Sequence, residues 1–131
     1  MSPVGHASFK SITWEETPYA EFDGGRKMTR VHAVFAYEGD IVGEGTVDYL
    51  MAYGADGLGI FVGLERIVGS VNGKSGSFAA QHTGIFDLKA VHTHWVFVPG
   101  LGTEGLEGIT GSGELKLEGH GPYAFTFEYN F

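Results

Sequence analysis

The sequence predicts an all-β protein, a single eight-stranded antiparallel meander that closes into a small barrel. Runs of β-forming residues recur every 10 to 14 residues, and a glycine-containing turn follows nearly every run. The 131 residues include 22 Gly, 10 Phe and 6 Tyr, a combination typical of short strands joined by tight turns. Helical periodicity is almost absent. This length suits one domain over residues 1–131.

Each expected strand ends at a recognisable turn. The strands are predicted at residues 7–16, 28–38, 43–53, 59–69, 75–86, 90–98, 106–117 and 122–131. Asn72-Gly73 is the strongest hairpin signal, and Asp56-Gly57 has the same character. Sequential hairpins give a meander, and eight strands leave two long edges unless the sheet closes. A barrel is therefore expected, with a two-sheet sandwich as the alternative architecture.

Hairpin register sorts three of these strands onto two faces. A two-residue loop at Asn72-Gly73 places Gly63 opposite His82, and a three-residue loop at 87–89 places His82 opposite His94. Because side chains alternate along a strand, the faces separate. One face carries Ile60, Val62, Leu64, Arg66, Val68, Ala79, Gln81, Thr83, Ile85, Val91, Trp95 and Phe97. The other carries Phe61, Gly63, Glu65, Ile67, Phe78, Ala80, His82, Gly84, Phe86, His92, His94, Val96 and Val98.

The first of these faces is the bulkier and more continuously apolar, so it is expected to line the interior. Tyr49 and Met51 would join it if Ala55 pairs with Leu58, and a one-residue slip would send them to the opposite face.

An interior polar group is the first candidate site. Arg66, Gln81 and Tyr49 would lie together and bind a carboxylate or carbonyl oxygen of a ligand. The apolar walls of this site would be Met51, Trp95 and Phe97. In the alternative interpretation, Arg66 lies at the barrel mouth and reaches solvent.

Glu65 and His82 form the second candidate site, diagonal to one another on one face. A carboxylate that orients a histidine is the arrangement needed for general acid–base catalysis, for example in an isomerisation. The neighbouring Gly63 and Gly84 leave a shallow hollow. The alternative is a surface or interface hydrogen bond.

The remaining histidines raise the question of a metal. His92 and His94 are spaced i, i+2 and would share a face with His82, as an open zinc site requires. Exposed histidines are the commoner outcome on a sheet surface, so no metal and no cofactor are expected.

Composition limits the partners. The formal charge of −8 argues against nucleic acid and against an anionic membrane surface. No segment is long and apolar enough to serve as a signal peptide or to span a bilayer. The chain contains no Cys, which fits a reducing cytoplasm and excludes thiol chemistry. A cytoplasmic location is expected.

Several segments together resemble a bacterial family of domains of unknown function, grouped with allene-oxide-cyclase-like barrels. The segments that carry the resemblance are Trp14-Glu15-Glu16, Pro18-Tyr19, the run 45–53, Asp56-Gly57, the run 61–66, Gly76-Ser77-Phe78, Gln81-His82-Thr83-Gly84 and Val98-Pro99-Gly100. The resemblance covers nearly the whole chain and implies an eight-stranded antiparallel barrel. Members of the wider group act on small hydrophobic ligands without a cofactor, often as oligomers.

Two functions follow as expectations. The leading one is a barrel that holds a small hydrophobic molecule, with cyclase or isomerase activity through Glu65, His82 and Arg66. The rival is a non-catalytic binding or homo-oligomeric assembly module with a solid core. An interior cavity of several hundred Å³ would favour the first.

Overall fold

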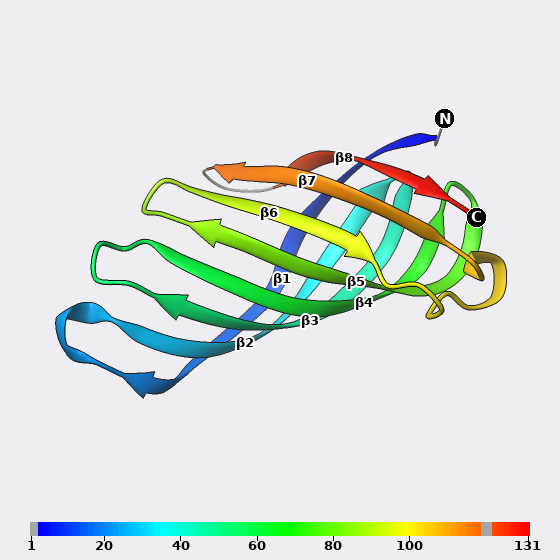
Figure 1. The fold of residues 1–131 in the computed structure, drawn as a ribbon. Coiled ribbons are helices and arrows are strands. Elements are labelled where there is room, and N and C mark those ends of the chain that lie inside the picture. The colour runs from blue at the N-terminus through cyan, green and yellow to red at the C-terminus, as the bar shows by residue number, and fades with distance from the viewer. Residues whose placement is uncertain (1–2, 119–121) are drawn as a thin grey trace.

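The computed structural model describes residues 3–118 and 122–131, and the chain forms a closed eight-stranded barrel (Figure 1). Every strand pairs antiparallel with its neighbours in sequence, and β8 pairs with β1. The strands are β1 (Val4–Glu21), β2 (Lys27–Gly39), β3 (Ile41–Tyr53), β4 (Gly59–Val71), β5 (Lys74–Phe86), β6 (Ala90–Phe97), β7 (Thr110–Glu118) and β8 (Tyr123–Asn130). Two short 3-10 turns, η1 (Asp23–Gly25) and η2 (Glu104–Leu106), complete the elements. The predicted fold class is confirmed.

The first strand is longer than expected. It continues through residues 17–21, beyond the predicted end at residue 16, and its register with β2 shifts at Ser11/Thr13 and at Pro18/Ala20. A proline is tolerated at such a bulge because its missing N–H is not needed there.

The β4–β5 hairpin follows the prediction. Val71 pairs with Lys74, and Gly63 lies opposite His82. Asn72 has a φ of 48° and Gly73 a φ of 84°, the two left-handed conformations that a type I′ turn requires.

The other two hairpins are each displaced by one residue from the prediction. Between β3 and β4, Tyr53 pairs with Gly59, because the Gly54 N–H donates to the Leu58 carbonyl and closes a wider loop. The predicted pairing of Ala55 with Leu58 is therefore wrong. The slip sends Tyr49 and Met51 to the face that carries Glu65.

Between β5 and β6 the turn is also one residue wider than predicted. The Asp87 carboxylate accepts hydrogen bonds from the backbone N–H groups of Lys89 (2.7 Å) and Ala90 (2.8 Å). Phe86 consequently pairs with Val91. His82 lies opposite Trp95, and the expected pairing of His82 with His94 is wrong.

The expected assignment of faces is wrong for β4 and β5. Phe61, Glu65, Phe78 and His82 are buried and point inward, whereas most of the side chains expected inside point out. Ile60, Val62, Leu64 and Ile85 are all exposed. The inward face alternates large aromatic side chains with glycines, which lets a narrow barrel accommodate its rings. On β6 the wider turn keeps Trp95 and Phe97 inside, as predicted.

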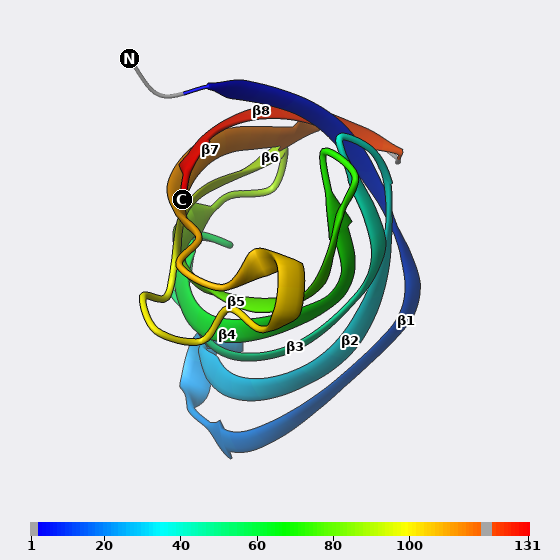
Figure 2. The same cartoon turned by 90° about the vertical axis from the view of Figure 1, so that its right-hand side faces the viewer.

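One end of the barrel is closed and tightly packed. The segment around η2 folds across this end (Figure 2). It buries Leu106 and Ile109 completely, above the aromatic rings of Phe78, Phe97 and Phe127. Leu106 therefore belongs to this plug, and the seventh strand begins at Thr110 instead of at residue 106. The connections β1–β2, β3–β4 and β5–β6 lie at the opposite end (Figure 1).

Candidate functional site

A cavity of about 110 Å³ lies inside the barrel. Its wall is mostly apolar and includes Met51, Phe61, Val91 and Trp95. Trp14 lines the same space and is 47% exposed, so the cavity reaches the surface beside β1. The volume is smaller than the several hundred Å³ expected of a site for a drug-sized ligand. It is close to the roughly 150 Å³ of an apolar cavity that accommodates benzene.

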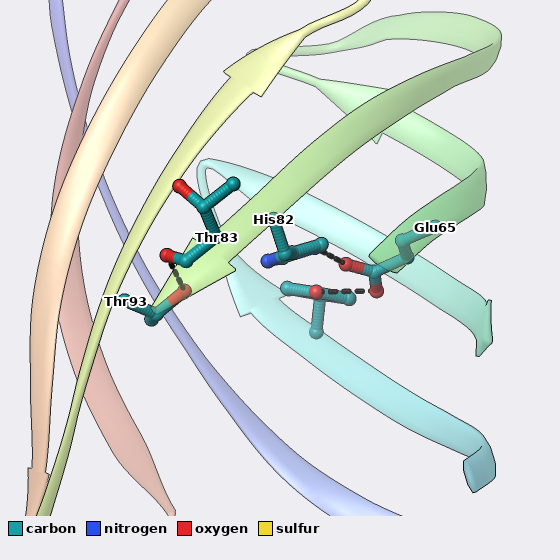
Figure 3. Close-up of polar contacts among 5 residues, drawn as sticks. Glu65, His82, Thr83 and Thr93 are labelled. Atoms are coloured by element: carbon teal, nitrogen blue, oxygen red, sulfur yellow. Dashed lines mark hydrogen bonds and ion pairs between the residues drawn. The ribbon is translucent and has the colours of Figure 1, made fainter. Parts of the chain in front are cut away.

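Three polar side chains form a hydrogen-bonded chain at the cavity wall. His82 on β5 and Glu65 on β4 point toward one another (Figure 3), with 2.7 Å between His82 Nε2 and Glu65 Oε1. The Tyr37 hydroxyl donates to Glu65 Oε2 at 2.6 Å. Glu65 is 1% exposed, so both carboxylate oxygens are withdrawn from solvent and satisfied by protein donors. The expected contact between Glu65 and His82 is confirmed.

This chain fixes the proton on the histidine ring. When Glu65 is ionised its carboxylate only accepts hydrogen bonds, so the contact then requires a proton on Nε2 of His82. In the neutral ring, Nδ1 then carries a lone pair. Every fully buried polar side-chain atom in the described part of the chain has a partner. No bond from Nδ1 is found among those residues, so Nδ1 retains accessible surface, and His82 lines the cavity.

The hydroxyl of Tyr49 is a second polar group at the cavity wall that lacks a hydrogen-bond partner among the described residues. Tyr49 is 9% exposed and lines the cavity, and no described residue hydrogen-bonds its hydroxyl. Burial, followed by the nearby negative charge of Glu65, raises the pKa of Tyr49 far above its ordinary value. The same two causes, with the hydrogen bond to Glu65, raise the pKa of Tyr37. Both phenols are therefore protonated at neutral pH.

Glycines provide the space in which these groups meet. Gly63 pairs with Tyr49 on one side and with His82 on the other. A Cβ on Gly63 would lie 2.4 Å from the Tyr49 ring, and a Cβ on Gly45 would meet the Glu65 carboxylate. The two rings that flank Gly63 contact each other edge to face, with 5.7 Å between centroids.

A second polar cluster organises the rim of the cavity. The Glu16 carboxylate accepts hydrogen bonds from Trp14 Nε1 (3.1 Å), from the Thr29 hydroxyl (2.7 Å) and from the Tyr53 hydroxyl. Partial burial acts to raise the pKa of Glu16, but these donors outweigh it and the pKa is lowered. Glu16 thereby holds the Trp14 indole beside Tyr49, at 6.1 Å between ring centroids.

The residues predicted for the interior polar group are separated by the barrel wall. Tyr49, Met51 and Trp95 line the cavity. Arg66 and Gln81 are exposed on the outer face, because β4 and β5 present the opposite face from the one expected. Arg66 donates to the Ser77 hydroxyl at 3.3 Å. Phe97 is buried in the closed half, 4.8 Å from Phe78 between ring centroids, and does not reach the cavity.

The three histidines considered for a metal site, His82, His92 and His94, do not lie together. His92 and His94 lie on the outer face of β6, and His94 approaches Glu114 at 3.4 Å. Across residues 3–118 and 122–131, no three acidic or histidine side chains are arranged to hold a metal ion.

Sequence reasoning missed Tyr37 and Thr93. Tyr37 alternates with Phe35 and Ala33 along β2, and this pattern marks an inward face, but nothing in it connects Tyr37 to Glu65 two strands away. Thr93 is buried at the cavity wall and donates to the Thr83 carbonyl at 3.4 Å (Figure 3).

Comparison with known proteins identifies the family. The family described as "Protein of unknown function (DUF3224)" matches residues 5–129. The chain belongs to this family. A crystal structure of a DUF3224 protein of unknown function from Shewanella oneidensis MR-1 is 27% identical, with a TM-score of 0.82. The alignment covers 100% of this chain and 98% of that one. No curated protein matches the chain.

The resemblance found in the sequence is thus confirmed. The DUF3224 relatives support the barrel fold, and their descriptions assign no activity. In the described residues, no helix is long and apolar enough to cross a membrane.

Proposed function

We propose that this DUF3224 barrel binds a small, mostly apolar molecule in its interior cavity and that His82 acts on it as an acid–base group. One observation carries the proposal. The apolar cavity is lined by two residues whose polar atoms keep accessible surface and accept or donate no hydrogen bond among the described residues, His82 at Nδ1 and Tyr49 at its hydroxyl. A hydrogen bond contributes about 0.5–1.5 kcal/mol net, so a ligand that pairs with both groups would gain this contribution twice.

The reaction class that fits is an isomerisation or cyclisation that needs only proton transfer. The Glu65 carboxylate fixes the ring orientation and stabilises the imidazolium that forms when His82 accepts a proton. The apolar wall excludes water and confines the substrate. Arg66, which faces outward, takes no part in this proposal.

The size of the cavity limits the ligand to a ring of five or six atoms or a short chain. A larger molecule would need to project past Trp14 or to displace Met51, whose unbranched side chain is adaptable. A rigid, drug-sized ligand is not expected to bind.

Benzene, with methyl-13C-methionine as the reporter, provides the test. Of the 3 methionines, Met51 lines the cavity and Met28 is exposed on the same sheet, so the methyl signals of Met51 and Met28 separate interior from exterior binding. Benzene should shift the Met51 signal alone, with a Kd of about 1 mM, as expected for so few contact atoms.

Val91→Phe should abolish the shift by filling the cavity, whereas Val96→Phe on the outer face of the same strand should preserve it. An unresponsive Met51 in the folded wild-type protein would refute interior binding.

A second candidate function is assembly through the outer face. Leu50 pairs with Val62, and Ile60 pairs with Ile85, so exposed apolar side chains run across β3, β4 and β5 beside Leu64. Contiguous apolar surface of this kind is typical of interfaces, and a second copy of the chain could cover it about a two-fold axis.

Sedimentation velocity tests this candidate. The wild-type protein should sediment as an oligomer, Leu64→Lys as a monomer, and Ile12→Lys on β1 like the wild type. A monomeric wild-type protein at 100 µM, a concentration of the order at which a weak interface would be populated, would exclude assembly.

A further inference from the structure

We infer that the ligand is a small ketone or aldehyde with an acidic α-hydrogen, and that His82 Nδ1 and the Tyr49 hydroxyl divide its enolisation between them. This inference rests on the proposed function, since it specifies the chemistry of the same cavity. It follows from the different capacities of the two unsatisfied groups.

The Tyr49 hydroxyl acts as a donor. It lies in an apolar wall and is held protonated by burial and by the charge of Glu65, so it can donate to an oxygen that becomes negative. A phenol fixed beside a carboxylate cannot itself readily become the anion. This makes it suited to a carbonyl oxygen and poorly suited to a carboxylate ligand, which would lie close to the Glu65 charge.

His82 Nδ1 acts as the base. The ring of this cavity-lining residue is anchored at the other nitrogen by Glu65, which is in turn anchored by Tyr37, so the Nδ1 lone pair has a fixed direction on the side of the ring away from Glu65. When Nδ1 takes a proton, the positive charge forms against the Glu65 carboxylate. Tyr37 and Glu65 are therefore positioning residues, while His82 and Tyr49 touch the substrate.

Gly63 brings donor and base onto one molecule. It occupies the sheet position between Tyr49 and His82, and its missing side chain allows their rings to meet edge to face at 5.7 Å between centroids. The oxygen of a carbonyl group and the α-carbon are separated by two bonds, so one small substrate can contact the Tyr49 hydroxyl and His82 Nδ1 together.

The step is balanced without a cofactor. The Nδ1 lone pair forms an N–H bond as the α C–H bond breaks. The C–H electron pair becomes the C=C bond of the enolate, and the carbonyl π pair moves to the oxygen bound by Tyr49. The imidazolium then returns its proton to the α-carbon. In a β,γ-unsaturated ketone it can instead protonate the γ-carbon, which gives the conjugated isomer.

Two probes test the inference on the intact protein. Cyclopent-3-en-1-one in D2O reports α-hydrogen exchange and isomerisation by proton NMR. Phenol and benzene form a matched pair for binding, because phenol adds one hydroxyl that can donate to Nδ1 and accept from Tyr49. We expect phenol to bind roughly tenfold more tightly than benzene.

The variants separate the two roles. His82→Gln keeps a donor for Glu65 but lacks the base, so it should lower the exchange rate by about 10²–10⁴-fold. Tyr49→Phe should lower it by about 10²-fold and reduce the preference for phenol. His94→Gln makes the same chemical change on the outer face and should alter neither.

The outcomes distinguish this inference from the proposed function. If the wild-type protein exchanged the α-hydrogens no faster than buffer does, while benzene still shifted the Met51 methyl signal, the enolisation chemistry would be overturned and ligand binding would stand. Failure of both benzene and phenol to enter the cavity would overturn both. Exchange that survives in His82→Gln would show that another group is the base and would also overturn the inference.

Discussion

Tyr37→Phe should destabilise the barrel far more than the same change at Tyr49. Tyr37 donates a 2.6 Å hydrogen bond to a carboxylate that is 1% exposed, and its removal leaves Glu65 Oε2 buried without a donor. A hydrogen bond to a charged group contributes about 1.5–3 kcal/mol, so we expect a loss of about 2 kcal/mol. Tyr49→Phe removes a hydroxyl that no described residue bonds and should change stability by less than about 0.5 kcal/mol.

Thermal unfolding measures this difference. Unfolding entropy near 60 °C is about 2.1 cal/mol/K per residue, which for 131 residues makes 1 kcal/mol equivalent to a Tm change of about 3.6 °C. Tyr37→Phe should therefore unfold about 7 °C below the wild type, and Tyr49→Phe within about 2 °C of it. Equal Tm values for the two variants would refute the assignment of Tyr37 as the support of Glu65.

Three further predictions concern pH, space and the closed end. Because the folded-state pKa values of Tyr37 and Tyr49 are raised, their stabilising effect is complete below pH 10, and the free energy of unfolding decreases as the pH rises further. In Tyr49→Phe this decrease between pH 10 and 12 should be shallower by up to about 1.4 kcal/mol per pH unit, and a decrease as steep as in the wild type would count against burial of that phenol. Gly45→Ala should cost more than about 2 kcal/mol in urea unfolding, because the new methyl group occupies the space of the Glu65 carboxylate; a neutral result would show that the carboxylate can move aside. Leu106→Ala should cost about 2–5 kcal/mol, since Leu106 is fully buried in the plug, and a cost below 1 kcal/mol would show that the plug does not support the barrel.

The sequence was sufficient for the fold because turn chemistry is local. Asn72-Gly73 determines its own φ angles and with them the register of β4 and β5. The register of the other hairpins depended on hydrogen bonds that the amino-acid sequence does not reveal. The Asp87 carboxylate widened one turn by accepting two backbone N–H groups, and a carbonyl at Leu58 widened another. One residue of displacement in each was enough to change which side chains face each other.

The inward face was misjudged for a physical reason. Bulk and continuous hydrophobicity pointed to the face of Ile60, Val62 and Leu64, which the barrel exposes. A narrow barrel instead needs glycines opposite its aromatic rings, as at Gly63 beside Tyr49. The Glu65–His82 pair could be predicted because it depended only on the secure hairpin. Tyr37 contacts Glu65 from β2, which is separated from β4 by β3. A hairpin turn determines the register of two adjacent strands only, so this contact could not be predicted from the turns.

The proposed chemistry requires that the barrel interior present His82 Nδ1 to a ligand as an unprotonated acceptor. Long-range proton–nitrogen NMR of the 15N-histidine protein, titrated with phenol, measures the protonation of this atom. Among the 6 histidines, His82 alone should respond. Its Nδ1 should have the shift of an imine-type nitrogen and should change as phenol binds, while Nε2 keeps its proton toward Glu65. A proton on Nδ1, or a response confined to His92 or His94 on the outer face, would contradict the account.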